Sequence, residues 1–193
     1  MKQSIEKHPL GFFLPKNAEV LILGSFPPKK ERWSMDFYYP NFQNDMWRIF
    51  GLVFFNDKNY FINEAKNGFD KGIVEPFCKR KGIAIGDSAI EIIRLKDNAS
   101  DKFLQVVKAI DIEKTLKKLP KCRAIVSTGQ KSMETLLSVC SVKEPKIASW
   151  SPFSILGRTI KLFRMPSSSR AYPLSLEKKA LIYKKMFQNL NFI

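Results

Sequence analysis

The chain has little of the chemistry that metal sites and disulfide frameworks need. It contains three cysteines, Cys78, Cys122 and Cys140, and one histidine, His8. Three widely spaced cysteines match neither a disulfide framework nor a zinc-ligand set, so we expect small core residues. Because the one histidine lies in an N-terminal segment that we expect to be mobile, the sequence argues against a histidine-based catalytic triad and against a metal site.

Long apolar runs are also missing. No run approaches the roughly 20 residues that span a bilayer, and residues 1–8 lack the apolar stretch of a signal peptide. We therefore expect a cytoplasmic protein without a membrane partner. A length of 193 residues with 45% hydrophobic side chains is sufficient for a buried core, and we expect one domain over residues 1–193.

Acidic side chains are outnumbered. The 33 lysines and arginines against 18 aspartates and glutamates give a formal net charge of +15. Such an excess favours a polyanionic partner, which means DNA, RNA or an anionic membrane surface. A lysine-rich solvated surface with no such partner is the alternative that charge alone leaves open.

Two similar strand exits lie near opposite ends of the chain. Residues 20–23 (VLIL) stop at the segment 24–28 (GSFPP), and residues 159–163 (TIKLF) lead to 165–169 (MPSSS). Proline fixes φ, glycine lets the backbone approach a ligand, and serine hydroxyls can bond phosphate. Since ligands bind at the carboxyl ends of strands in open α/β sheets, the two exits predict a groove that grips a nucleic-acid backbone.

The remaining pattern alternates strands with helices. We expect strands at 20–23, 83–86, 122–127 and 159–164, an edge strand at 11–14, helices beginning at 44 and spanning 66–81, 89–96, 111–119, 131–140 and 175–189, and an irregular segment at 147–156. This order predicts an α/β fold, a three-layer α/β/α domain around a mostly parallel four-stranded sheet.

The motifs resemble those of the uracil-DNA glycosylase superfamily, whose first motif follows the first central strand and whose second is a Pro-Ser loop after the last. Between them, residues 39–47 (YPNFQNDMW) are similar to the superfamily segment that ends in Asn-x-Phe-Trp at a helix start. The likeness covers residues 19–187. It is strongest to the hypoxanthine-DNA (deoxyinosine) glycosylase branch and next to the mismatch-specific uracil/thymine branch.

The resemblance implies a DNA repair enzyme of base excision repair. It would be a monofunctional glycosylase that hydrolyses the N-glycosidic bond of hypoxanthine or uracil flipped out of DNA, as a monomer and without a metal or cofactor. Two positions depart from the pattern: Phe26 stands where uracil-excising members carry an acid or Asn, and Met165 stands where the best-known members carry His. The resemblance then assigns the positioning of water to Asn44. Asn44 could instead cap the helix, and Asp45 is a second candidate that could simply complement the helix dipole.

Further site residues follow from the same resemblance. The base pocket is expected to contain Gly24, Ser25, Phe26, Phe37, Tyr39 and Asp87. Contacts to DNA are expected from Pro27, Ser167, Ser168, Ser169, Arg170 and Lys131. Each type of residue also has a plainer explanation: aromatic core packing, a helix cap at Asp87, which we favour, a tight turn at the serines, and a strand-to-helix junction before Lys131.

Two other functions stay open at this point. Phe26 and Met165 are compatible with a catalytically inactive nucleic-acid-binding protein that retains the glycosylase fold. The serine loop alone is compatible with an unrelated α/β enzyme that acts on a small phosphorylated substrate.

Overall fold

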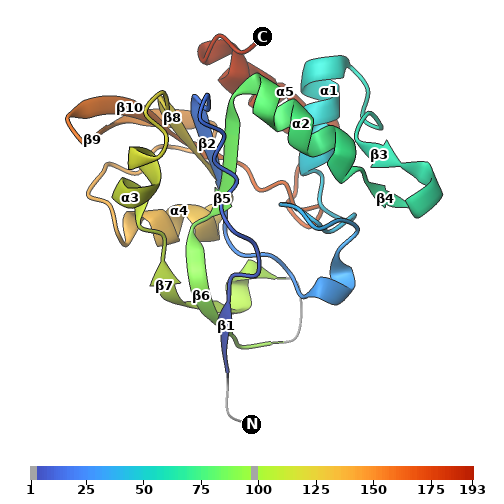
Figure 1. Ribbon diagram of the computed structural model, residues 1–193, viewed down its shortest axis with the longest axis horizontal. Coiled ribbons are helices and arrows are strands. Elements are labelled where there is room, and N and C mark those ends of the chain that lie inside the picture. Colours follow the sequence, from blue (N-terminus) through green and yellow to red (C-terminus); the bar gives the residue numbers. More distant parts are fainter. Residues whose placement is uncertain (1–3, 97–99) are drawn as a thin grey trace.

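The computed structural model describes residues 4–96 and 100–193, and a five-stranded sheet lies at its centre (Figure 1). Its strand order is β5-β2-β8-β10-β9. The bounds are β2 Val20–Gly24, β5 Ile83–Asp87, β8 Ala124–Thr128, β9 Ser149–Ile155 and β10 Arg158–Met165. The first four strands in that order run parallel, and β9 pairs antiparallel with β10 at the edge.

Helices cover both faces of this sheet, which confirms the expected α/β/α layering. Val20 and Ile22 pack in a core with α1 (Met46–Phe55), α2 (Lys71–Lys81) and α5 (Leu176–Asn189). Leu21 and Leu23 face the other way, towards α3 (Ile112–Lys117) and α4 (Gln130–Leu137). Successive side chains of a strand point to opposite faces, so one buried strand supplies both cores.

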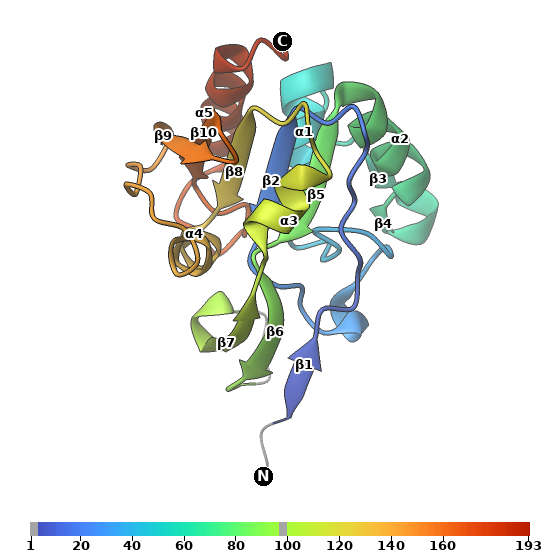
Figure 2. The same cartoon turned by 60° about the vertical axis from the view of Figure 1, so that its left-hand side comes forward.

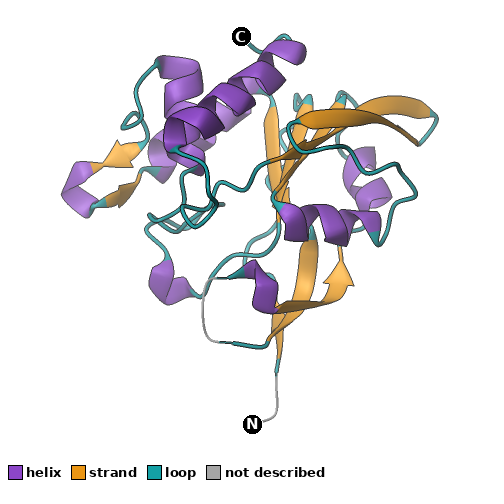
Figure 3. Ribbon diagram, turned by 180° about the vertical axis from the view of Figure 1, so that it is seen from behind, coloured by secondary structure: helices purple, strands orange, loops and turns teal. Residues whose placement is uncertain are grey.

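A second, antiparallel sheet stands beyond the carboxyl ends of the central strands (Figure 2). It contains β1 (Ile5–Lys7), β6 (Ala89–Arg94) and β7 (Leu104–Ala109) in the order β1-β6-β7. Short elements complete the chain, namely η1 Lys30–Arg32, β3 Ile62–Asn63, η2 Glu64–Lys66, β4 Gly68–Phe69 and η3 Asp101–Phe103 (Figure 3). The second sheet brings β1 and η3 to the same end of the molecule as the two expected ligand loops.

Several expected elements were wrong. Residues 89–96 form strand β6 rather than a helix, and a bulge between Ala89 and Ile92 hides the alternation that would have indicated a strand. Residues 147–156 are not irregular, because β9 occupies most of them as an edge strand, where Pro152 can be accommodated. The sheet therefore has five strands instead of four. The segment 11–14 contributes only an isolated bridge from Phe13 to Ile85.

The helix expected over 66–81 begins at Lys71, where the Asp70 side chain accepts a hydrogen bond from the Gly72 amide. Of the cysteines, Cys78 and Cys122 are buried as expected, and Cys140 is partly exposed. Within the two described ranges, no helix has the length and apolar character needed to cross a membrane.

Candidate active site

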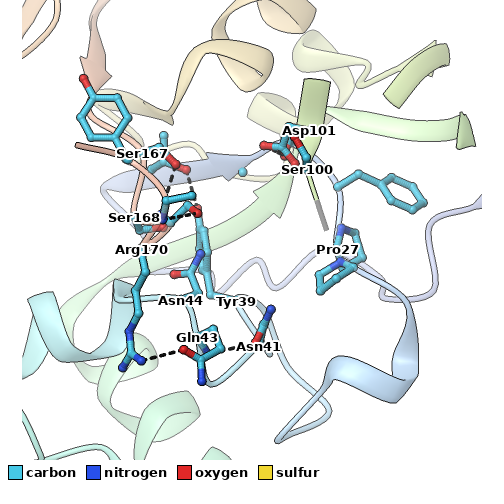
Figure 4. Close-up of a pocket in the computed structure, with 18 of the residues that line it drawn as sticks. Pro27, Tyr39, Asn41, Gln43, Asn44, Ser100, Asp101, Ser167, Ser168 and Arg170 are labelled. Carbon is cyan, nitrogen blue, oxygen red and sulfur yellow. Dashed lines mark hydrogen bonds between the residues drawn. The ribbon is translucent and has the colours of Figure 1, made fainter. Parts of the chain in front are cut away.

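A pocket of 710 Å³ lies at the carboxyl ends of the central strands. The segment after β2 and the segment after β10 both line it, so the two motifs near opposite ends of the sequence meet in space (Figure 4). Such a volume suits a small organic group the size of a nucleoside. The lining residues are 24–28, 32, 38–41, 43, 44, 87, 100–102, 128 and 167–173.

Asn44 lies two residues before α1. Its Oδ1 accepts a hydrogen bond from the amide of Met46 (2.9 Å), the first residue of the helix, but the cap position itself is held by Asp45 and not by Asn44. An amide oxygen has two lone pairs, so this bond fixes the side chain and still leaves one acceptor site. The Asn44 carbonyl accepts from Arg48 Nη1 (3.2 Å), which also binds the Phe42 carbonyl and steadies the loop before the helix.

Asn44 and the serine loop form one hydrogen-bonded unit. Asn44 makes an isolated β-bridge with Ser169, and the Asp45 amide donates to the Ser168 carbonyl at 2.8 Å. We call residues 44–45 and 167–170 the asparagine–serine wall. The unit places the expected water-holding residue directly beside the expected phosphate-binding residues.

The Asp45 carboxylate makes no hydrogen bond to the helix that it precedes. Instead Oδ1 accepts from Arg170 Nε and Oδ2 from Lys179 Nζ, both at 3.1 Å. Lys179 lies on α5, is fully buried, and also donates to the Ser169 carbonyl at 2.7 Å. Both carboxylate oxygens are thus committed to cations that brace the asparagine–serine wall, so Asp45 is poorly placed to hold water.

The serine loop is fixed by further hydrogen bonds. Ser167 Oγ accepts from the Ser169 amide at 3.2 Å, and Tyr183 Oη donates to the Pro166 carbonyl at 2.9 Å. Gly129 lies under the loop with φ of +89°, and a Cβ there would approach Ser167 Cβ to 3.3 Å. Glycine permits both the conformation and the close approach.

The opposite side of the pocket carries two carboxyl groups, Asp87 and Asp101, which we call the acidic wall. Asp87 is the last residue of β5 and packs against Gly24, where a Cβ would come within 2.3 Å of Asp87 Oδ1. The helix cap that we favoured for Asp87 is wrong, because β6 and not a helix follows.

His8 neutralises Asp87. Its Nε2 lies 2.7 Å from Asp87 Oδ2, and its Nδ1 lies 2.7 Å from the Leu10 carbonyl oxygen. Both oxygens can only accept, which fits a ring protonated on both nitrogens, whereas the Leu10 amide, which donates towards Nδ1 at 3.1 Å, fits an unprotonated Nδ1. Burial lowers the His8 pKa, but the bond to Asp87, its negative charge and the Leu10 carbonyl outweigh burial and raise the pKa above its ordinary 6.5. The N-terminal segment from Ser4 to His8 is therefore not the mobile end that we expected.

Asp101 precedes β7 in η3 and has weaker compensation. Its Oδ2 accepts a hydrogen bond from Ser25 Oγ at 2.7 Å. Burial raises the pKa of the Asp101 carboxyl; the Ser25 hydrogen bond lowers it, the charge of Asp87 raises it, and the charges of Lys131 and Arg94 lower it, with a net rise. A carboxyl with a raised pKa inside a cleft is a candidate functional group.

Tyr39 closes the pocket between the two walls (Figure 4). It adopts a positive φ of 51°, and its hydroxyl bonds to Thr128 Oγ1 at 2.9 Å. Thr128 in turn donates to the Leu23 carbonyl at 3.1 Å. A chain of hydrogen bonds therefore ties the Tyr39 ring to the end of β2, which keeps an aromatic face in the pocket.

Most residues predicted for the site line this pocket. They are Gly24, Ser25, Phe26, Pro27, Tyr39, Asn44, Asp87, Ser167, Ser168, Ser169 and Arg170. Phe37 does not line it, because the ring packs in the core against Phe13 and Trp47. Lys131 also lies outside the lining and pairs with Glu134 at 3.7 Å.

Several residues of the site or its support were not predicted from the sequence. Among them are His8, Asp101, Thr128 and Lys179. Only Lys179 left a signal in the sequence, since it falls on the same helical face as Tyr183, Met186 and Phe187, which are buried. The others reach the site through tertiary contacts that no local pattern encodes.

Comparisons with known proteins agree with this architecture. No protein-family model matches the sequence, and no curated protein matches it. Among solved structures, the chain is similar to the solution NMR structure of a "putative Uracil DNA glycosylase" from Methanosarcina acetivorans, with a TM-score of 0.64 and 22% identity over 97% of this chain and 99% of that one. The two chains share a fold over nearly their whole lengths.

Proposed function

We propose that the protein is a DNA glycosylase that removes a deaminated base, hypoxanthine or uracil, and leaves an abasic site. The observation that carries this proposal is the unit of Asn44 with the serine loop at the edge of a nucleoside-sized pocket. The fold shared with a protein named as a uracil DNA glycosylase and the net charge of +15 support it independently.

Hydrolysis of the N-glycosidic bond requires a positioned water molecule and a site that stabilises positive charge on the sugar. The free lone pair of Asn44 Oδ1 would accept a hydrogen bond from the attacking water while the Met46 amide holds the side chain still. The same carbonyl dipole would stabilise the developing sugar cation. The bond to the Met46 amide and the bond to water are then two uses of one oxygen.

The rest of the asparagine–serine wall would hold the DNA backbone. Serine hydroxyls and backbone amides of residues 167–169 would bind phosphates beside the flipped nucleotide. Arg170 lies at the rim, where its guanidinium bonds to Asp45 and to Gln43 Oε1 (2.7 Å) and its side chain is 44% exposed. It would contact a phosphate or fill the space that the extruded base leaves.

Phe26 replaces the acid of uracil-excising enzymes and contacts His8 edge-on, with ring centroids 5.1 Å apart. The substitution removes one means of activating water, and it favours the second candidate function, a nucleic-acid-binding protein without catalysis. The first candidate rests on Asn44 acting in place of the acid.

The test is single-turnover excision from oligonucleotides that contain inosine or uracil. We expect Asn44→Ala to lower the rate about 10²- to 10³-fold, as the loss of one transition-state donor or acceptor does elsewhere. Asn44→Ser retains a side-chain oxygen that can accept from the Met46 amide, so it controls for an effect of the substitution on folding. Asn59→Ala, whose side chain makes no hydrogen bond within the described residues, is the control that should leave the rate unchanged.

The outcomes separate the candidates. Excision that survives Asn44→Ala at full rate contradicts the role of Asn44. No excision of either base by the wild type, with salt-sensitive DNA binding intact, identifies the inactive binding protein. If the protein has no affinity for DNA at low salt, the remaining candidate is an α/β enzyme that acts on a small phosphorylated substrate.

A further inference from the structure

The acidic wall is unexpected in a pocket that receives DNA. Asp87 and Asp101 line it in a chain of net charge +15, and Figure 4 shows Asp101 across the pocket from Ser167 and Ser168. An ionised carboxylate repels a phosphate, so Asp101 is better suited to an uncharged part of the nucleotide than to the DNA backbone. What remains for it to face is the uncharged base, whose N–H groups are donors.

The two carboxyl groups differ in how many of their oxygens already have a partner. Asp87 is paired with His8, whose Nε2 lies 2.7 Å from Oδ2, and its other oxygen packs against Gly24. Among the described residues, the hydrogen bond that Asp101 accepts comes from the hydroxyl of Ser25, through Oδ2. Within the described part of the chain, Oδ1 of Asp101 has no hydrogen-bond partner. Asp101 is therefore the carboxyl group with an acceptor to spare.

Deamination changes the edge of a base in a way that a carboxylate can detect. Adenine and cytosine present a ring-nitrogen lone pair beside an amino group. Hypoxanthine and uracil present an N–H beside a carbonyl at the same place. An ionised carboxyl accepts a hydrogen bond from that N–H and repels the lone pair of the parent base.

We propose that Asp101 selects deaminated bases by accepting, through Oδ1, the ring N–H that deamination creates, and by repelling the lone pair of adenine or cytosine. The proposal rests on the proposed function, since it names what the same pocket recognises. Asp101 would be a specificity-determining residue, whereas Asn44 would act on the water.

The charge state of Asp101 makes the discrimination between deaminated and parent bases depend on pH. The groups that act on it are Asp87 from β5, Arg94 from β6, Lys131 from α4 and the Ser25 hydroxyl, and its own charge acts on Tyr39. A protonated Asp101 could donate to adenine N1 as well as to a carbonyl. Discrimination is therefore expected to weaken as pH falls and Asp101 takes up a proton, a step brought closer to neutrality by its raised pKa.

Asp101→Asn is the decisive variant. Asparagine keeps an oxygen acceptor for Ser25 Oγ. It presents an amide to the base, and this amide can hydrogen-bond to the edge of the deaminated base or to that of the parent base. The measurement is binding to duplexes that carry 2′-fluoro-2′-deoxyinosine or 2′-fluoro-2′-deoxyadenosine, nucleosides whose glycosidic bonds resist cleavage. The variant loses one negative charge, which raises its affinity for any DNA. We therefore compare the ratio of the two affinities and not either affinity alone.

We expect the wild type to prefer the inosine duplex and Asp101→Asn to reduce that preference about 10- to 100-fold, the range of one good base contact. Asp111→Asn makes the same chemical change at the cap of α3, outside the pocket lining, and should retain the preference. Lowering the pH should reduce the preference of the wild type more than that of Asp101→Asn.

An unchanged ratio in Asp101→Asn overturns the proposal even if excision is robust. Equal affinities in the wild type overturn it as well. If the wild type excises no base, the proposed function fails on its own assay, and the affinity ratio still decides whether Asp101 reads the base edge.

Discussion

The two walls of the pocket handle buried negative charge in opposite ways. On the asparagine–serine wall, Asp45 has a cation on each oxygen, and one of these, Lys179, is fully buried. On the acidic wall, the hydrogen-bond partner of Asp101 among residues 4–96 and 100–193 is the Ser25 hydroxyl, and the net effect of its surroundings raises its pKa. A fully satisfied charge fixes a structure, whereas an incompletely satisfied one is available to a ligand.

The change with the largest expected effect breaks the first wall at its centre. Lys179→Met leaves the Asp45 carboxylate buried with Arg170 alone, and we expect a loss of about 3–5 kcal/mol in the free energy of unfolding. Denaturant unfolding measures it. Lys178→Met, one residue earlier and exposed, is the matched control. The double variant Lys179→Met/Asp45→Asn should be more stable than Lys179→Met. If the two variants lose the same free energy of unfolding, the unpaired Asp45 carboxylate is not the cause of the loss.

The next change disturbs the acidic wall through packing. A methyl group at Gly24 would meet Asp87 Oδ1 at 2.3 Å, so Gly24→Ala forces the carboxylate away from His8. We expect a loss of about 1–3 kcal/mol, as for other overpacked sites. Gly11→Ala adds the same methyl where nothing lies within 4 Å and should change the free energy of unfolding by less than about 0.5 kcal/mol. Similar losses in both variants would contradict the close contact.

A smaller effect tests the charge on His8. Its raised pKa means that the folded state holds the proton more tightly, so this stabilisation is complete below pH 6.5 and is lost as pH rises through the folded-state pKa. We expect His8→Gln to cost about 1–2 kcal/mol at pH 6 and less at pH 9, measured by urea unfolding. Lys7→Gln, exposed on β1, should show no such pH dependence. A cost for His8→Gln that is constant from pH 6 to pH 9 would rule out the charged pair.

The smallest effect sharpens the contrast between the walls. Because the pKa of Asp101 is raised, ionisation opposes folding above the ordinary pKa of aspartate, so wild-type stability falls as pH rises through the folded-state value. Asp101→Asn should therefore gain stability relative to the wild type between pH 3 and pH 7, by about 1 kcal/mol or less. Thermal unfolding across that range measures it. A relative loss with rising pH would show that Asp101, like Asp45, is a stabilising charge.

The sequence was informative where one residue pattern had one meaning. β2, β5 and β8 are short runs buried on both faces, β10 alternates between polar and buried apolar residues, and all four lie where the pattern placed them. The helix expected from residue 175 is also present as α5, and Ser175 caps it, since its Oγ accepts a hydrogen bond from the Lys178 amide. In these cases local chemistry and tertiary structure agree.

The errors occurred where tertiary pairing overrides local pattern. Residues 89–94 pair with both β1 and β7, and a bulge interrupts their alternation. The acidic wall was even less accessible, because Asp101 meets Ser25 across 76 positions of sequence and His8 meets Asp87 across 79. The resemblance to glycosylases indicated the loops but not the charges that face them.

The order of the chain has a consequence for its synthesis. Asp45 leaves the ribosome early, in the helix start after the first motif, whereas Lys179 lies on the last helix, α5. A nascent chain that has emerged only as far as β8 holds the Asp45 carboxylate without the amine that neutralises it, and without the serine loop that Asn44 pairs with. The site is thus assembled only after the central sheet is nearly complete, so an incomplete chain carries no working pocket.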